Sequence, residues 1–364
     1  MPDKGALVVA NSVYQLLTAV HMRRSVLADR AVELLLTDVT PGLPDCLPRL
    51  RASGTFDRVI GGRTAWINQQ YGGGKEETDE GFGHLDQVFR FALDDELGDY
   101  DQVFFANFDI FTRMLACWFY HRPCRFIWFE DGFSSYVIDY LREDRAAVNR
   151  HTEARKIGDK VEQVLLYEPR LAMRGDGLVN RRLPKINRED GALKELLNYI
   201  FDYRAPQEEP DFIFLEQSFR AEGIRCNDLE LMEECRRTVG SGRFMVKPHP
   251  RNPENLPLKL GLSRRYSDAA PWELRLLNQE PERQTVLTVC SNAALTGRLV
   301  FGLDPPVVML YELFDGKVLW KEDAVLRKYL RAFQARFAGE NYYVPRTVFE
   351  LRRTLEYLGG RHGG

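Results

Sequence analysis

The sequence predicts an α/β protein of two doubly wound, Rossmann-like domains that face a cleft. Short, near-continuous apolar runs alternate with helical segments, which is the pattern of parallel sheets covered by helices on both faces. The alternation pauses in a charged stretch near residues 150–160 and then resumes, which leaves two halves of similar size. A chain of 364 residues is long enough for two such domains.

In the first half, helical segments follow the predicted strands. Ala6–Ala10 reads as a buried strand, and Asn11 and Ser12 can cap the helix after it. Further strands are predicted at 32–36, 56–60, 101–105 and 125–129, with helices at 84–93, at 109–121 and from Ser134 onward. The segment 67–83 contains three successive glycines and several acidic residues, so we expect a mobile loop there.

The second half repeats the alternation. Strands are predicted at 161–166, 211–215, 243–246, 285–289 and 307–310, with helices at 228–239, 292–300, 321–337 and 346–358. We therefore expect an N-terminal domain over 1–155 and a C-terminal domain over 156–345, with the hinge near 150–205. The last helix, 346–358, is expected to pack back on the first domain.

Composition excludes several classes of protein. Fifty basic and 53 acidic side chains give a net charge of −3, which argues against a nucleic-acid binder that relies on bulk charge. The six cysteines show neither a CxxC motif nor zinc-ligand spacing with histidine. No stretch approaches the roughly 20 apolar residues of a membrane span. We expect a cytoplasmic protein, and peripheral contact with the inner face of the membrane and a homodimer remain open.

The segment Lys247-Pro248-His249-Pro250 is the most informative in the chain. It follows the apolar strand 243–246, so it lies where a buried strand ends. Imidazole can donate or accept a proton near neutral pH, and the two prolines hold His249 in an extended backbone. The segment therefore offers a cation and a proton donor at the carboxyl edge of a sheet, where open α/β sheets bind ligands. The alternative is a solvated strand end.

A pair of carboxylates follows another predicted strand. Glu130 and Asp131 come directly after 125–129, and Gly132 follows them. Two adjacent carboxylates are difficult to bury in ionised form, so one of them can have a raised pKa and act as a general base. The alternative is a turn that Asp131 caps and for which Gly132 supplies an unusual φ.

Two further segments supply groups that suit a nucleotide. Ser291 and Asn292 lie between a strand and a helix, where hydroxyl and backbone N–H groups can bind a phosphate or simply cap the helix. Glu273 could accept hydrogen bonds from the two ribose hydroxyls, or could be a solvated residue at a helix start. Because neither GxGxxG nor GxxxxGK[ST] occurs, dinucleotide and P-loop sites have little support. The set favours group transfer from a nucleotide-activated donor held by the second domain.

With these motifs the chain resembles the bacterial sialyltransferases, which share an acidic pair followed by Gly, an HP motif and a Ser-Ser/Thr motif on a GT-B fold of two Rossmann-like domains. The closest likeness is to glycosyltransferase family 52, the lipooligosaccharide sialyltransferases. NSVYQLLTA near the start, FIFLEQSF at 212–219 and APWEL at 270–274 add to it. The third motif departs from the pattern, because Asn292 replaces the second hydroxyl residue.

The resemblance implies an inverting transfer of sialic acid from CMP-sialic acid to a galactose-type hydroxyl of a cell-surface glycan, lipooligosaccharide or capsule. It needs no metal and no cofactor, and the partners are the CMP-sugar donor and an oligosaccharide acceptor. In this interpretation either Glu130 or Asp131 is the base, and the resemblance does not decide between the two. In the same interpretation His249 donates to the departing phosphate, and Lys247 contacts the cytosine side. Glu273 binds the ribose, and Ser291 and Asn292 bind the phosphate. Pro250, the second residue of the HP motif, also belongs to the nucleotide-binding set.

Three other residues are candidate substrate contacts, because they follow predicted strands or the acidic motif: Asn11, Asn107 and Ser134. Two alternatives to the sialyltransferase also remain. One is a capsule or teichoic-acid-type transferase that uses CMP-Kdo or CDP-glycerol, since such enzymes combine a similar histidine segment with a serine phosphate site. The other is a non-catalytic protein that binds a nucleotide or a sugar.

Overall fold

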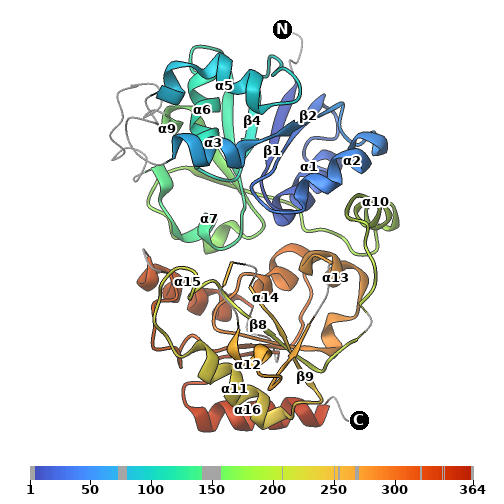
Figure 1. Cartoon of the computed structure of the whole chain (residues 1–364), viewed down its shortest axis with the longest axis vertical. Helices are drawn as coiled ribbons and strands as arrows, with labels where there is room; N and C mark the ends of the chain where they lie inside the picture. Colours follow the sequence, from blue (N-terminus) through green and yellow to red (C-terminus); the bar gives the residue numbers. More distant parts are fainter. Residues whose placement is uncertain are drawn as a thin grey trace. The chain divides into compact units, whose positions relative to one another are not determined.

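The computed structural model divides into two compact units, which are described separately below. It describes residues 5–361 except 73–79, 142–156, 207, 250, 253–254, 267–269, 320–321, 338 and 340. Unit 1 comprises residues 1–184 and 191–202, and unit 2 comprises 185–190 and 203–364. Each unit is built on its own parallel sheet (Figure 1). In the described part of the chain, no helix is both long and apolar enough to cross a membrane.

The described strands of unit 1 form a seven-stranded sheet in the order β3-β2-β1-β4-β5-β6-β7, with every neighbouring pair parallel. The strands are β1 (Ala6–Ala10), β2 (Val32–Thr37), β3 (Arg58–Gly62), β4 (Gln102–Phe105), β5 (Arg125–Phe129), β6 (Val161–Leu166) and β7 (Val179–Arg182). The chain builds outward from β1 to β3 and then returns to place β4 on the other side of β1. The carboxyl ends of β1 and β4 therefore form a topological switch point, the usual place for a ligand in such sheets.

Helices cover both faces of this sheet (Figure 1). They are α1 (Val13–Arg24), α2 (Leu47–Ser53), α3 (Thr64–Tyr71), α5 (Leu85–Ala92), α6 (Ile110–Trp118), α7 (Ser134–Val137), α9 (Ile157–Lys160) and α10 (Gly191–Phe201), and a 3-10 turn, Leu43–Cys46, precedes α2. Ser12 caps α1 through its hydroxyl, which accepts from the Gln15 N–H at 3.2 Å, and Asp109 caps α6 through its carboxylate, which accepts from the Thr112 N–H at 2.8 Å. These caps fix where each helix begins beside its strand.

Unit 2 repeats the same order of winding. Its described strands form the sheet β10-β9-β8-β11-β12-β13, again parallel throughout. They are β8 (Phe212–Leu215), β9 (Phe244–Lys247), β10 (Arg264–Arg265), β11 (Thr285–Thr288), β12 (Val307–Met309) and β13 (Tyr342–Tyr343). The switch point of this sheet lies between β8 and β11. Strands β9 and β10 lie on the far side of β8, and β12 and β13 lie on the far side of β11.

The helices of unit 2 also lie on both faces of its sheet. They are α11 (Asp228–Val239), α12 (Leu256–Lys259), α13 (Trp272–Asn278), α14 (Ala293–Thr296), α15 (Asp323–Arg336) and α16 (Val348–Arg361), and a π-helix, Gly297–Phe301, continues α14. In Figure 1, α11 and α16 lie on one side of the strands and α13 and α14 on the other. The inner faces of strands and helices are apolar and almost fully buried, which is the main source of stability for each unit.

The predicted fold class is confirmed, but the units divide at other residues than the predicted domains. Strand β6 pairs with β5, and β7 pairs with β6, so the first sheet continues well past residue 155. The last helix, α16, packs on α11 within unit 2, where Arg352 pairs with Glu234 at 2.5 Å. The expectation that it returns to the first domain is therefore corrected. Part of the expected loop 67–83 is also helical, since α3 runs to Tyr71.

Candidate active site

Three polar side chains cross the switch point of unit 1. Gln15, which is buried, accepts a hydrogen bond from the Asn11 N–H at 2.8 Å and donates to the side chain of Asn107. Asn11 follows β1 and Asn107 follows β4, so one glutamine ties together the ends of the two strands. Asn11 is 3% exposed and accepts from the Thr37 hydroxyl at 2.9 Å, and these are the contacts of a structural residue. Asn107 is half-buried.

Asp131 lies on a tight turn at the carboxyl end of β5. Its N–H donates to the Ser135 hydroxyl at 2.8 Å, and its carbonyl accepts from Ser134 at 3.2 Å. Gly132 has φ +74°, a conformation that favours glycine, so the turn needs this residue. The side chain of Asp131 remains half-buried, and Ser134 serves the turn that presents it.

Glu130, in contrast, lies wholly inside unit 1. It has no exposed surface, and its carboxylate accepts from the Tyr14 hydroxyl at 2.8 Å, from the Tyr167 N–H at 2.8 Å and from the Tyr136 hydroxyl. Tyr136 belongs to α7 and Tyr167 follows β6, so the carboxylate joins three parts of the unit. Of the two adjacent carboxylates, Glu130 is occupied by the protein and Asp131 is partly accessible.

Burial raises the pKa of both carboxyl groups. It raises the pKa of Glu130 to about 7, against the hydrogen bonds from Tyr136, Tyr167 and Tyr14 that favour the ionised form. Burial also raises the pKa of Asp131 to about 6, and a hydrogen bond from Gln15 opposes this shift. A half-buried carboxyl group with a pKa near 6 is suited to accept a proton near neutral pH.

In unit 2, the KPHP segment leaves the end of β9 as expected. His249 is half-buried, and burial followed by the charge of Arg251 lowers the pKa of its imidazole. Its Nδ1 accepts from the Arg251 N–H at 3.3 Å, which leaves Nε2 as the ring nitrogen not engaged in that contact. Lys247 is the last residue of β9. Pro250 lies outside the described residues.

Glu273 lies close enough to Lys247 for the two charges to interact. Burial raises the pKa of this half-buried carboxyl group, and the charge of Lys247 lowers it. The Lys247 ammonium also lies 5.9 Å from the centre of the Tyr266 ring. Glu273 is in the first turn of α13, directly after the buried Trp272. The structure thus brings a cation, a carboxylate and an aromatic ring together beside the end of β9.

Ser291 and Asn292 connect the end of β11 with α14, and both are half-buried. The Ser291 N–H donates to the Thr288 hydroxyl at 3.2 Å, and the Ser291 hydroxyl accepts from the Ala293 N–H at 3.3 Å. The indole of Trp272 donates to the Ala293 carbonyl at 2.9 Å, so α13 and α14 are held together at this edge. The Glu273 and Ser291 segments are therefore neighbours in unit 2.

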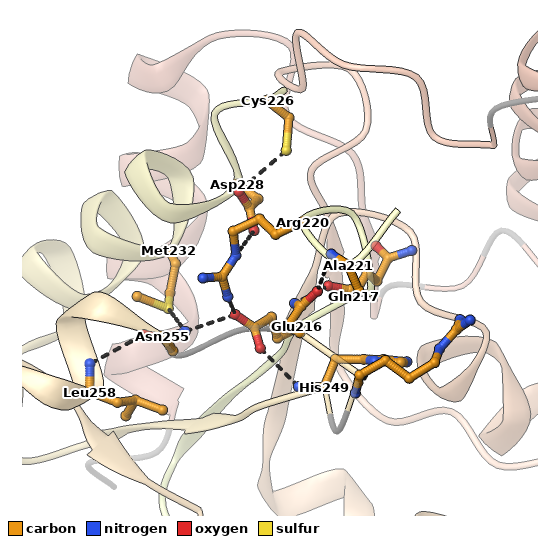
Figure 2. Close-up of polar contacts among 12 residues, drawn as sticks. Glu216, Gln217, Arg220, Ala221, Cys226, Asp228, Met232, His249, Asn255 and Leu258 are labelled. Atoms are coloured by element: carbon orange, nitrogen blue, oxygen red, sulfur yellow. Dashed lines mark hydrogen bonds and ion pairs between the residues drawn. The ribbon is translucent and has the colours of Figure 1, made fainter. Parts of the chain in front are cut away.

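Sequence reasoning did not assign a role to the two residues that connect these segments. Glu216 and Gln217 follow β8, the strand between β9 and β11. Glu216 accepts from the His249 N–H at 2.8 Å, and the Gln217 amide oxygen accepts from the Cys290 N–H at 2.6 Å (Figure 2 shows the Glu216 cluster). A signal was present in the sequence, because a polar pair ends the apolar run 212–215 just as Glu130 and Asp131 end the run 126–129.

Within the described residues, no group of three or more His, Cys, Asp or Glu side chains is arranged to hold a metal ion. The two sheet edges differ in the chemistry that they present. Unit 1 presents a carboxyl group that can accept a proton, and unit 2 presents imidazole, ammonium, hydroxyl and backbone N–H groups that can meet an anion.

Comparison with known proteins gives likeness of fold without likeness of sequence. No family model matches the chain, and no curated protein matches its sequence. Among solved structures, the UDP-GlcNAc 2-epimerase of Methanocaldococcus jannaschii aligns with a TM-score of 0.52 and 9% identity over 96% of this chain and 91% of its own. Arabidopsis thaliana UGT89C1 complexed with UDP aligns with a TM-score of 0.51 and 13% identity over 98% and 90%.

A third solved structure with the same fold is itself a bacterial sialyltransferase. The α/β-galactoside α-2,3-sialyltransferase of the luminous marine bacterium Photobacterium phosphoreum aligns with a TM-score of 0.50 and 7% identity. The alignment covers 96% of this chain and all of that one. These alignments span both units, and the fold of the chain is that of the GT-B glycosyltransferases, with two parallel-sheet, Rossmann-like domains.

Proposed function

We propose that the protein is an inverting, metal-independent sialyltransferase that moves sialic acid from CMP-sialic acid to a galactose-type hydroxyl of a cell-surface glycan, in lipooligosaccharide or capsule. The fold supports a nucleotide-sugar enzyme in general. The observation that carries the finer proposal is the acidic motif, where Glu130 is buried among its partners and Asp131 is partly accessible with a pKa raised to about 6. A decayed binding protein would have no need of such a group.

In this proposal Asp131 is the base that removes the proton from the acceptor hydroxyl. A base must reach the proton that it removes, and only a side chain with exposed surface can do so. Asp131 meets that condition, while Glu130 is fully buried and its carboxylate is held by three protein donors. Asn107 and Ser134 are half-buried at the same edge and remain candidate contacts with the acceptor.

The donor role falls to unit 2. Glu273 would accept from the ribose hydroxyls, and Lys247, beside it, would contact the cytosine side. Ser291 and Asn292 would bind the phosphate through hydroxyl, amide and backbone N–H groups, and His249 would donate to the same phosphate as it departs. Pro250 would restrict the backbone of His249 from the far side.

The bonds formed and broken follow from these roles. The acceptor hydroxyl oxygen forms a bond to the anomeric carbon of sialic acid while the bond from that carbon to the phosphate oxygen of CMP breaks. The hydroxyl proton passes to Asp131, and the electron pair leaves with the phosphate, whose negative charge His249 meets. A single displacement from the face opposite CMP inverts the anomeric configuration.

Release of CMP by the purified protein tests the proposal. CMP-sialic acid would be incubated with and without lactose, and with EDTA, and CMP would be measured. We expect lactose to stimulate release and EDTA to leave it unchanged. Release only from CMP-Kdo or CDP-glycerol would replace the sialyltransferase with one of those transferases. No release from any donor, with no thermal shift on addition of CMP, would refute a nucleotide-dependent transferase.

A further inference from the structure

The Pro248-His249-Pro250 segment has a single point at which its backbone can be held by a hydrogen-bond acceptor. Proline has no backbone N–H, so His249 is the only residue of the three with a donor. That N–H donates to Oε2 of Glu216 at 2.8 Å. The bond joins an N–H to a carboxylate, and such charge-assisted bonds are stronger than those between neutral groups.

Glu216 is held in place on the neighbouring strand. It follows β8, and its own N–H donates to the carbonyl of Lys247 at 3.1 Å, which continues the ladder between β8 and β9 by one residue. It is 5% exposed. Glu216 therefore contacts the KPHP segment twice, through its backbone before the first proline and through its side chain after it.

The second carboxylate oxygen of Glu216 is also occupied. Oε1 accepts from the Asn255 side-chain amide at 2.8 Å and forms an ion pair with Arg220 (Figure 2). The Arg220 guanidinium lies 3.8 Å from Asp228 in turn. A buried carboxylate needs such compensation, and here a cation and an amide fix the carboxylate plane from the side opposite His249.

We propose that Glu216 is a positioning residue for His249, which it holds by the one backbone donor of the Pro-His-Pro segment and supplies with a negative charge. This inference rests on the proposed function, in which His249 donates to the departing phosphate. A ring that must meet a developing charge gains from being held before the reaction begins.

The charges around His249 give the proposal a second, electrostatic consequence. Among the described residues, Arg251 on the same loop lowers the pKa of the imidazole, and Glu216 and Glu222 raise it. The carboxylate of Glu216 favours the protonated ring, which carries a positive charge and an N–H donor on both nitrogens. Glu222 has a similar charge but binds Arg251 and Ser218, and no described contact joins it to the His249 N–H. Glu222 is therefore a matched control.

The experiment compares Glu216→Gln with Glu222→Gln in the full-length protein labelled with ¹⁵N-histidine. The chain has six histidines, so the spectra are simple, and loss of signals in His249→Gln assigns those of His249. Hydrogen exchange of the His249 amide and the titration of its imidazole are measured in each variant. Transfer is followed against pH in parallel, with circular dichroism to confirm folding.

We expect amide exchange at His249 to become roughly ten- to a hundredfold faster in Glu216→Gln, the range expected when a hydrogen bond to a charged group is weakened. The pKa of its imidazole should fall. The loss of kcat as the pH rises should therefore begin at a lower pH than in the wild type, with little change in KM for the donor. Glu222→Gln should lower the imidazole pKa and leave the exchange rate within twofold of that of the wild type.

Three results would decide against the inference or separate it from the function. Unchanged His249 exchange in a folded Glu216→Gln protein would overturn it. If that variant fails to fold, Asn255→Ala takes its place, because it removes one of the two partners that fix the Glu216 carboxylate and keeps its charge, and unchanged exchange there would overturn it as well. If both His249 effects appear and the wild type releases no CMP, the positioning of the imidazole is supported and the proposed function is refuted.

Discussion

Replacing Glu130 by Gln should remove a large pH dependence from the stability of the protein. Burial raises the pKa of Glu130 from an ordinary value of 4.5 to about 7 in the folded chain. Folding therefore favours the protonated carboxyl group. The stability that this supplies is complete below about pH 4.5 and is lost as the pH rises through 7.

The size of the effect follows from the two pKa values. At about 1.36 kcal/mol for each pKa unit, the full loss is about 3 kcal/mol, and most of it falls between pH 5 and pH 8. Gln keeps the volume and can accept from the Tyr167 N–H while its amide donates to the Tyr14 hydroxyl. It cannot ionise, so the variant should lack this dependence.

Urea denaturation of the wild type and of Glu130→Gln, followed by far-UV circular dichroism at several pH values, would measure it. The difference between the two free energies of unfolding cancels contributions from other groups. We expect the wild type to lose about 2–3 kcal/mol relative to the variant from pH 5 to pH 8. Parallel curves for the two proteins would refute the claim that Glu130 is enclosed in an environment that disfavours its charge.

Other predictions concern transfer itself. Asp131→Asn should abolish transfer and leave the melting temperature close to that of the wild type, and full activity would remove Asp131 from the role of base. The wild-type rate should fall as the pH drops through about 6, the value to which burial raises the pKa of Asp131, and Gln15→Leu should move this limb to higher pH because it removes a hydrogen bond that opposes the shift. His249→Ala should abolish transfer while CMP binding, measured by calorimetry, survives in part; unchanged turnover would show that no acid is needed there.

Much of the fold could be predicted from the sequence because its central strands are apolar. The strands β1, β5 and β6 have the predicted bounds, and all three lie inside a parallel sheet, where β1 is buried throughout and most positions of β5 and β6 are buried. The missed strands lie at sheet edges or are very short. All residues of β7 are exposed, and Arg264–Arg265 carries no apolar signal at all.

The candidate site was predicted less completely, for a physical reason. Residues such as Asp131, His249 and Ser291 follow apolar strands, so their place at an edge can be read from the chain. Gln15 and Glu216 act by bridging segments that are distant in sequence, and no local pattern reveals which side chain will reach a partner 92 or 33 residues away. The same holds for the buried role of Glu130, which depends on three tyrosines.

The glutamines at the two switch points have a consequence for how the protein responds to pH. Gln15 joins the ends of β1 and β4, and Gln217 joins the ends of β8 and β11 through Cys290. An amide has no charge to gain or lose over the physiological range, so these ties do not titrate themselves while the nearby carboxyl and imidazole groups do. Each edge thus combines amide ties that do not ionise with groups that do, and a proton that binds there changes the charge of the edge and not the charge of its ties.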